Sequence, residues 1–244
     1  MTRWYKSPLF FFHLATHASV VPMFLYADLS DYFIALIFYY LFGCWGVAIT
    51  YHRLISHKAF VSPKWFKTIG LILGSLGGVG TSIQWTAVHR KHHRYSDTDQ
   101  DPHNPNGRFW TMQFFPMLVQ SSERYVPDLL RDKQQVWFHK NYWYIHAVYT
   151  VALLAIDPFA IVYAYLFPCL VLWHVMSALG TFAHTDKFGY ATYVNKARNL
   201  PVLGWLAFGE GWHNNHHEKA SSARFGEKPW EFDLSWEIIK RISK

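Results

Sequence analysis

The chain has 244 residues, of which 51% are hydrophobic, 19% are aromatic and only 16% are charged. A charged fraction well below the roughly 25% of soluble domains argues against an ordinary cytosolic enzyme, and the apolar content excludes a disordered chain. The net charge of +7 is also found in nucleic-acid-binding proteins, which carry it on a folded soluble face. Here the lysines and arginines are confined to three blocks of the chain, so nucleic acid is not an expected partner.

Two long windows, residues 7–52 and 141–186, contain no lysine or arginine. One crossing of a bilayer needs about 20 apolar helical residues, so each window is long enough for two crossings and a tight turn. The turns are visible at Asp28-Leu29-Ser30-Asp31 and at Asp157-Pro158. We therefore expect membrane spans at about residues 8–27, 32–50, 141–156 and 159–182.

The basic residues also predict an orientation. Cytoplasmic loops of membrane proteins carry an excess of lysine and arginine, whereas both predicted turns are acidic. We expect both termini, and a cap formed by residues 51–140 and 183–244, on the cytoplasmic side. The sequence thus predicts one all-α integral membrane domain over residues 1–244, with four transmembrane helices in two hairpins. Two buried hairpins in a soluble protein are the alternative, but buried helices seldom lack lysine and arginine over such lengths.

Fifteen histidines are many for a chain of this length, and eight of them form three clusters. The clusters are His52 and His57; His89, His92 and His93; and His213, His216 and His217. In the two HxxHH clusters the three imidazoles fall within about a 100° arc of a helix, so they point to one side. In the HxxxxH cluster the pair spreads over roughly 140° of an α-helix. This wider spacing suits a helix end, or two ligands that reach different metal ions.

The histidine clusters predict a metal site. Neutral imidazole is the commonest metal ligand, and the only cysteines, Cys44 and Cys169, lie within predicted spans. Ligand sets without cysteine favour a borderline transition metal such as iron, zinc or copper. A structural zinc site is saturated by four ligands, so eight or nine histidines indicate two ions with open positions for dioxygen or water. Chance clustering is the alternative that such a constellation disfavours.

The uncharged, glycine-rich residues 68–89 have the hydropathy of a fifth span. A crossing there would place His52 and His89 on opposite sides of the membrane. Because we expect these histidines to share a site, the segment is predicted to lie in the interface, or to re-enter and return on the same side.

These clusters resemble the membrane fatty acyl desaturases, particularly the Δ9 acyl-CoA and acyl-lipid type. The similar stretches are HRLISH at 52–57, HRKHH at 89–93, DTDQDPHN at 97–104 and GEGWHNNHH at 209–217. The resemblance covers most of the chain and implies four spans, a cytoplasmic cap and a di-iron centre held by nine histidines. The ligands that it implies are His52, His57, His89, His92, His93, His184, His213, His216 and His217.

The resemblance extends to other residues around the centre. Trp85 matches a tryptophan that shapes the bend of the family's acyl tunnel, with packing in the cap as the alternative. The family often has an asparagine that holds a metal-bound water where this chain has Gly180. Metal-bound imidazoles are usually oriented by hydrogen-bonding partners, and apart from the resemblance the candidates for this role are Asp97, Asp99, Asp101 and Glu210, with a solvated loop charge as the alternative for each. His103 and Asn104 are expected to brace the cap rather than bind iron.

Removing hydrogen from an unactivated methylene needs a cofactor that activates dioxygen. The resemblance implies an oxygen-dependent acyl desaturase that introduces a cis double bond, expected at Δ9, with two iron ions (Fe²⁺/Fe³⁺) as cofactor and dioxygen as co-substrate. The expected substrate is a long acyl chain on CoA or in a glycerolipid. The expected electron donor is a separate protein, such as a ferredoxin or a cytochrome b-type protein. The alternatives are a di-iron hydroxylase or ketolase of alkane, carotenoid or sphingolipid, and a histidine-rich membrane metal transporter.

Overall fold

The computed structural model describes residues 7–103 and 122–243, so the candidate Asn104 lies outside the described residues. Within these ranges the chain is helical and contains no strand, which confirms the all-α prediction for this part of the protein. Two isolated antiparallel bridges join Tyr190 to Asn199 and Asn199 to Trp212.

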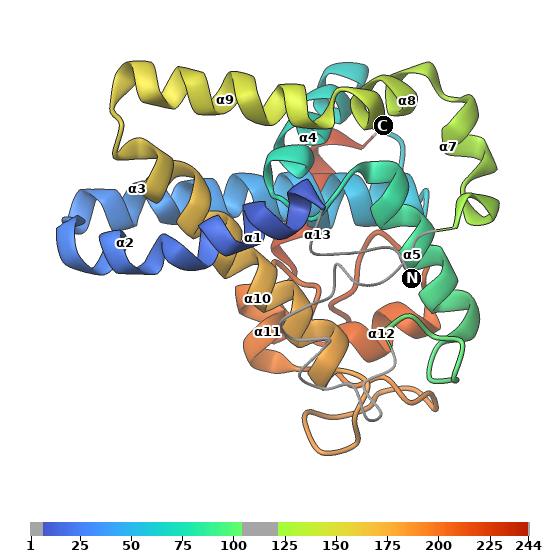
Figure 1. The fold of residues 1–244 in the computed structure, drawn as a ribbon. Helices are drawn as coiled ribbons and strands as arrows, with labels where there is room; N and C mark the ends of the chain where they lie inside the picture. Colours follow the sequence, from blue (N-terminus) through green and yellow to red (C-terminus); the bar gives the residue numbers. More distant parts are fainter. Residues whose placement is uncertain (1–6, 104–121, 244) are drawn as a thin grey trace.

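The described residues form a series of helices joined by turns and loops (Figure 1). In chain order they are α1 (Pro8–Ala18), α2 (Val20–Tyr26), α3 (Leu29–Tyr40), η2 (Leu41–Ser56), α4 (Lys64–Leu76), α5 (Ser82–Tyr95), η4 (Glu123–Tyr125), α7 (Pro127–Arg131), α8 (Lys133–Lys140), α9 (Tyr142–Ile156), η5 (Val162–Leu166), α10 (Phe167–Phe182), α11 (Pro201–Leu206), α12 (His213–Glu218) and α13 (Leu234–Ile242).

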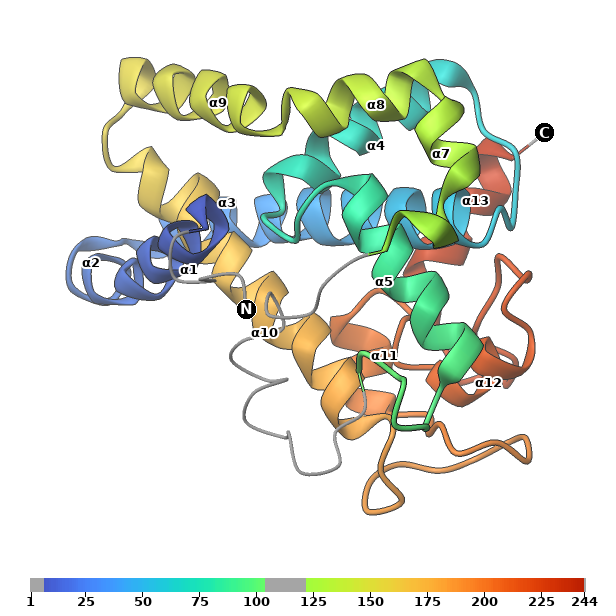
Figure 2. The same ribbon diagram turned by 45° about the vertical axis from the view of Figure 1, so that its right-hand side comes forward.

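Within residues 7–103 and 122–243, three helical stretches are long and apolar enough to cross a membrane. They are Pro8–Tyr26, Leu29–Ser56 and Val162–Phe182, with 19, 28 and 21 residues. The fourth predicted span corresponds to α9, which has 15 residues and is about 22 Å long, shorter than the ~30 Å core of a bilayer. The turn between α2 and α3 and the turn between α9 and η5 lie at the same end of the molecule in both views (Figures 1 and 2).

The helix that carries the first histidine cluster continues further than predicted. The second span was expected to end near residue 50, but α3 runs without interruption into η2, which ends at Ser56. His52 and Arg53 therefore lie inside this helix and are buried. η2 is a π-helix, in which each N–H group bonds the carbonyl five residues earlier, and the same pattern continues where the His57 N–H donates to the His52 carbonyl at 3.1 Å.

Residues 68–89 do not form one long helix. They form most of α4 and the first half of α5, and both helices are too short to cross a bilayer. The turn between them has φ values of 73° at Gly78 and 91° at Gly80, a backbone region that only glycine adopts easily. A capping box between Thr81 and Gln84 then starts α5. The turn brings α5 back beside η2, so the segment returns to the side of the molecule that carries the histidines. Its position relative to a membrane stays a prediction.

The core lies where η2 packs against α4 and α10. Phe42, Val47 and Leu172 are fully buried there. The end of the molecule that holds the hairpin turns instead exposes large apolar side chains, with 80% of Phe24 and 82% of Ile156 accessible. In Figure 2, α5 and α12 stand together on one side of η2, away from the hairpin turns. The candidate histidines are carried on α5, on α12 and at the adjoining end of η2, except His184, which follows α10.

Candidate metal centre

Nine histidines converge in two groups that could each hold a metal ion. The five-histidine group consists of His52, His57, His89, His93 and His216, and the four-histidine group consists of His92, His184, His213 and His217. Within each group, the ring nitrogens that face the centre all lie within 4.8 Å of one another. These are the nine residues that the resemblance implies.

The imidazoles of each group point the same atom, Nε2, toward a common centre. In the five-histidine group, Nε2 of His216 lies 3.1 Å from Nε2 of His52 and 2.9 Å from that of His93. In the four-histidine group, Nε2 of His213 lies 2.9 Å from Nε2 of His184 and 3.0 Å from that of His217. Convergent nitrogen lone pairs are the arrangement that imidazoles adopt around a cation.

Carboxylates bind the opposite ring nitrogen, Nδ1, of three of these histidines. His92 Nδ1 lies 2.8 Å from an Asp101 oxygen, and His184 Nδ1 lies 3.0 Å from an Asp97 oxygen. His52 Nδ1 contacts Glu210. A carboxylate on Nδ1 selects the tautomer with its proton there, which leaves the Nε2 lone pair free for a metal. Three of the four candidates for orienting residues are thus in contact with imidazoles, whereas Asp99 is exposed.

The two HxxHH clusters each contribute to both groups. On α5, His89 and His93 belong to the five-histidine group and His92 to the other; on α12, His213 and His217 belong to the four-histidine group and His216 to the other. Residues four apart lie one above the other on a helix, so each i, i+4 pair serves one group. The residue at i+3 is rotated away from that pair and reaches the neighbouring group.

The HxxxxH cluster lies at a helix end, one of its two predicted settings, since His57 directly follows η2. The other setting, with the two histidines on different metal ions, does not fit, because His52 and His57 belong to the same group. The π-helical bond from His57 to His52 explains the difference. It places residues five apart one above the other, and their ring centroids are 4.9 Å apart.

Burial favours the neutral form of seven of these imidazoles. Desolvation lowers the pKa of His57 to about 4. It lowers the pKa well below the usual value for His89, His92, His93, His213, His216 and His217. A neutral imidazole retains the lone pair that a metal needs, so the site is suited to bind a cation at physiological pH.

Buried asparagines position α12, and sequence reasoning gave them no role. The Asn214 side-chain oxygen accepts hydrogen bonds from the backbone N–H groups of Thr192 and Tyr193, both at 2.7 Å. Asn199 accepts from the Asn214 N–H at 2.9 Å and donates to the Asn215 side chain at 2.8 Å. These bonds tie the histidine-bearing helix to the segment that follows α10.

A cavity of about 320 Å³ opens beside both histidine groups. Its wall includes the His52, His89, His92 and His213 side chains, together with Trp85, Val88, His103, Trp173, Met176, Leu179, Gly180 and Glu210.

The Trp85 ring stacks on His89, with 4.7 Å between centroids. A Cβ added at Gly180 would meet no atom within 4 Å, so the glycine leaves open space. The His103 N–H donates to Asp101 at 2.8 Å, and its side chain belongs to neither group.

The family model for fatty acid desaturases matches residues 30–225, which is most of the chain. The chain belongs to the fatty acid desaturase family. It is 35% identical to the sn-1 stearoyl-lipid 9-desaturase of Synechocystis sp., over 96% of this chain and 76% of that protein. It is 33% identical to the sn-1 stearoyl-lipid 9-desaturase of Anabaena variabilis, over 86% and 79% of the two chains. It is also 33% identical to Delta-9 acyl-lipid desaturase 1 of Arabidopsis thaliana, over 85% and 70%.

The family assignment confirms the predicted resemblance and the predicted enzyme class, an oxidoreductase of the desaturase type. Among the described residues, the two groups of histidines agree with metal binding in this family. The apolar helices agree with a membrane location.

Proposed function

We propose that the protein is a membrane-embedded acyl-lipid desaturase that introduces a cis double bond at the Δ9 position of a long acyl chain. The observation that carries the proposal is the convergence of nine imidazoles beside a largely apolar cavity in a chain of the desaturase family. The position of the double bond and the lipid carrier follow relatives named as stearoyl-lipid and palmitoyl-lipid 9-desaturases.

Two iron ions are the proposed cofactor, one in each histidine group. The donors are neutral nitrogens without a thiolate, a set that suits iron, and the carboxylates on Nδ1 of three rings strengthen such ligands. Bound iron supplies the activation of dioxygen that side chains cannot provide. The net reaction takes two hydrogens from adjacent methylenes and, with two electrons and two protons from a donor, converts dioxygen to two water molecules.

The side chains around the cavity would hold the acyl chain against the two groups. Val88, Met176 and Leu179 line it with apolar surface, which favours a hydrocarbon chain and disfavours water. Trp85 also lines the cavity and stacks on His89, so its ring would set the path of the chain past the five-histidine group. Such positioning supplies the orientation on which selective attack at one C–C bond depends.

The topology that we propose has four spans, with α9 as the short third crossing and with the histidines and both termini on the cytoplasmic side. The common end of the two hairpin turns (Figure 1) and the absence of lysine and arginine from residues 7–52 and 141–186 support it. A ferredoxin or a cytochrome b-type protein would bring the electrons to the basic cytoplasmic face.

Expression in a bacterial host without its own acyl desaturase tests the function. Lipids are hydrolysed and the acyl chains are analysed by mass spectrometry with localisation of double bonds, and His216→Ala serves as the inactive control. We expect new cis-Δ9 chains with the parent protein and none with the variant. Unchanged acyl chains despite intact, iron-loaded protein would contradict a desaturase, and oxygenated chains would instead identify a hydroxylase.

A further inference from the structure

Arg53 is a cation buried inside the second long helix, with none of its surface exposed. Its guanidinium donates to Glu210 Oε1 from Nε at 3.2 Å and from Nη2 at 3.0 Å. Nη1 donates to both oxygens of Asp233 at 2.9 and 3.0 Å, and to the Ala223 carbonyl at 2.8 Å. Burying an arginine costs free energy unless its charge is paired and its N–H groups are hydrogen-bonded. Here both carboxylates and the carbonyl meet these needs, so the fold accommodates the buried charge.

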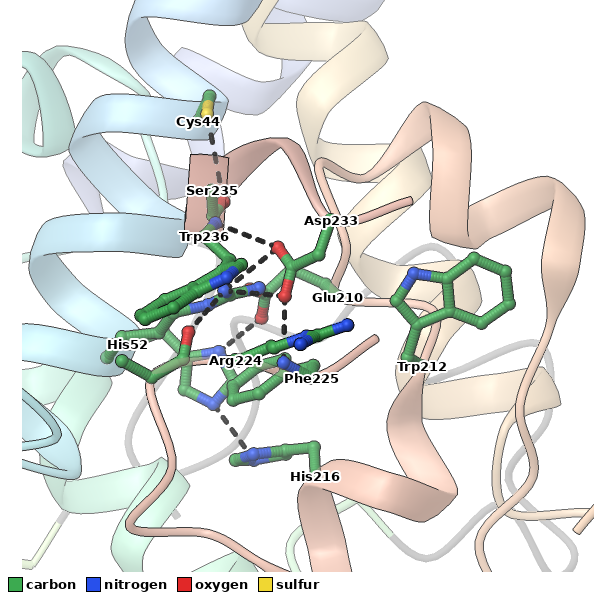
Figure 3. Close-up of polar contacts among 12 residues, drawn as sticks. Cys44, His52, Glu210, Trp212, His216, Arg224, Phe225, Asp233, Ser235 and Trp236 are labelled. Carbon is green, nitrogen blue, oxygen red and sulfur yellow. Dashed lines mark hydrogen bonds and ion pairs between the residues drawn. The ribbon is translucent and has the colours of Figure 1, made fainter. Parts of the chain in front are cut away.

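The same contacts reach the five-histidine group along two paths. Glu210 accepts from Arg53 with one carboxylate oxygen and contacts Nδ1 of His52 with the other. His52 in turn faces His216 with its opposite ring nitrogen (Figure 3). Arg53 also lies 3.8 Å from the centroid of the Phe225 ring, and that ring lies 4.2 Å from the ring of His216. The Arg53 guanidinium therefore contacts both Glu210, the partner of His52, and Phe225, which packs against His216.

The four-histidine group is supported differently. Asp101, which contacts His92, accepts hydrogen bonds from the backbone N–H groups of Asp97 at 2.9 Å and His103 at 2.8 Å. Asp97, which contacts His184, also accepts from Ser96 at 3.2 Å. These carboxylates belong to the loop after α5 and are oriented by that loop itself. A substitution at Arg53 should therefore change the metal affinity of the five-histidine group and leave that of the four-histidine group unchanged.

We propose that Arg53 is a positioning residue that sets the metal affinity of the five-histidine group, by fixing Glu210 on His52 and Phe225 on His216. The proposal rests on metal binding by the two groups, as put forward under the proposed function. Asp233 completes the arrangement, because it holds the guanidinium and also accepts from the Phe225 N–H at 2.8 Å. Arg53 thereby links the metal group to the C-terminal segment.

The test compares Arg53→Lys with Asp101→Asn in the full-length protein loaded with ⁵⁷Fe. Lysine keeps the charge but lacks the planar fork that bridges two carboxylates and stacks on an aromatic ring. We expect Arg53→Lys to weaken one of two iron sites by roughly ten- to a hundred-fold, the usual effect of removing a ligand's supporting partner. Asp101→Asn should weaken the other site to a similar extent. Chelator titration gives the affinities, and Mössbauer spectra show which iron changes.

Arg53→Met serves as a stronger version, and Arg53→Lys keeps the test valid if the methionine variant does not fold. Wild-type affinity at both sites in Arg53→Lys would overturn the proposal, as would loss of both irons together with a lower unfolding temperature, which would indicate a purely structural ion pair. The same iron signal changing in Arg53→Lys and Asp101→Asn would also overturn it. A wild-type protein that binds no iron would instead contradict the proposed function.

Discussion

Replacing Gly46 with alanine tests how closely η2 must approach α4 to hold the metal centre. A Cβ at this position would lie 2.7 Å from Gly74 Cα and from the Leu73 carbonyl carbon, whereas ordinary contact begins near 3.4 Å. The obstacle is backbone, which cannot rotate aside, so the two helices must separate by at least about 0.7 Å. His52 lies on the same helix, and the separation would displace it from its group.

The expected magnitude follows from two opposing effects. Overpacking costs about 1–3 kcal/mol, and the better helix propensity of alanine returns about 1 kcal/mol. Because backbone blocks the new methyl group, we expect a net loss of about 1–2 kcal/mol, which lowers the unfolding temperature by about 2–8 °C in a chain of this size. Iron should also be lost more readily, since errors of about 1 Å around a reacting centre are costly.

Gly180→Ala is the matched control, because it makes the same substitution in another apolar helix where an added Cβ meets nothing within 4 Å. Its unfolding temperature should equal or exceed that of the parent protein. Both variants are purified in the same detergent and compared by thermal unfolding and by iron content after dialysis. A Gly46→Ala protein as stable as Gly180→Ala, with full iron content, would refute the close helix crossing.

Three further outcomes are expected. Gly180→Phe should fill the cavity and abolish acyl turnover with normal iron content, and a fully active variant would contradict a substrate cavity there. Asn214→Ala removes the acceptor for two backbone N–H groups and should cost about 1–3 kcal/mol of unfolding free energy, which an unchanged thermal unfolding curve would contradict. For the metal-free protein, burial lowers the pKa of His57 and His103 from 6.5 to about 4. Between these values the unfolded chain binds more protons, so stability should fall as the pH drops through this window, and a flat profile from pH 7 to pH 4 would contradict it.

The histidine spacing singled out eight of the nine residues that meet, whereas His184 was implied only by the resemblance. The spacing did not predict how the nine would divide between two groups. In each HxxHH cluster the first and last histidines belong to one group, and the middle histidine belongs to the neighbouring group. The HxxxxH pair was ambiguous because the prediction assumed 3.6 residues per turn, whereas π-helical bonding at His57 brings residues five apart together. Residue spacing alone does not record whether a helix follows α or π geometry.

The distribution of lysine and arginine indicated where the apolar helices lie, but it did not indicate that Arg53 is buried. Arg53 falls within residues 51–140, which were expected to form the cytoplasmic cap, and the second span was expected to end near residue 50. The structure buries Arg53 between Glu210 and Asp233, which neutralise its charge from about 160 and 180 residues away in the sequence. A count of lysines and arginines does not distinguish a solvated cation from a paired one, and the partners are too distant for any local motif to reveal.

The central claim is that nine imidazoles hold two iron ions side by side. An anomalous difference map recorded at the iron absorption edge from the iron-loaded protein tests it most directly. The account predicts two peaks, one enclosed by the five-histidine group and one by the four-histidine group. A single peak, or two peaks away from these nitrogens, would contradict it.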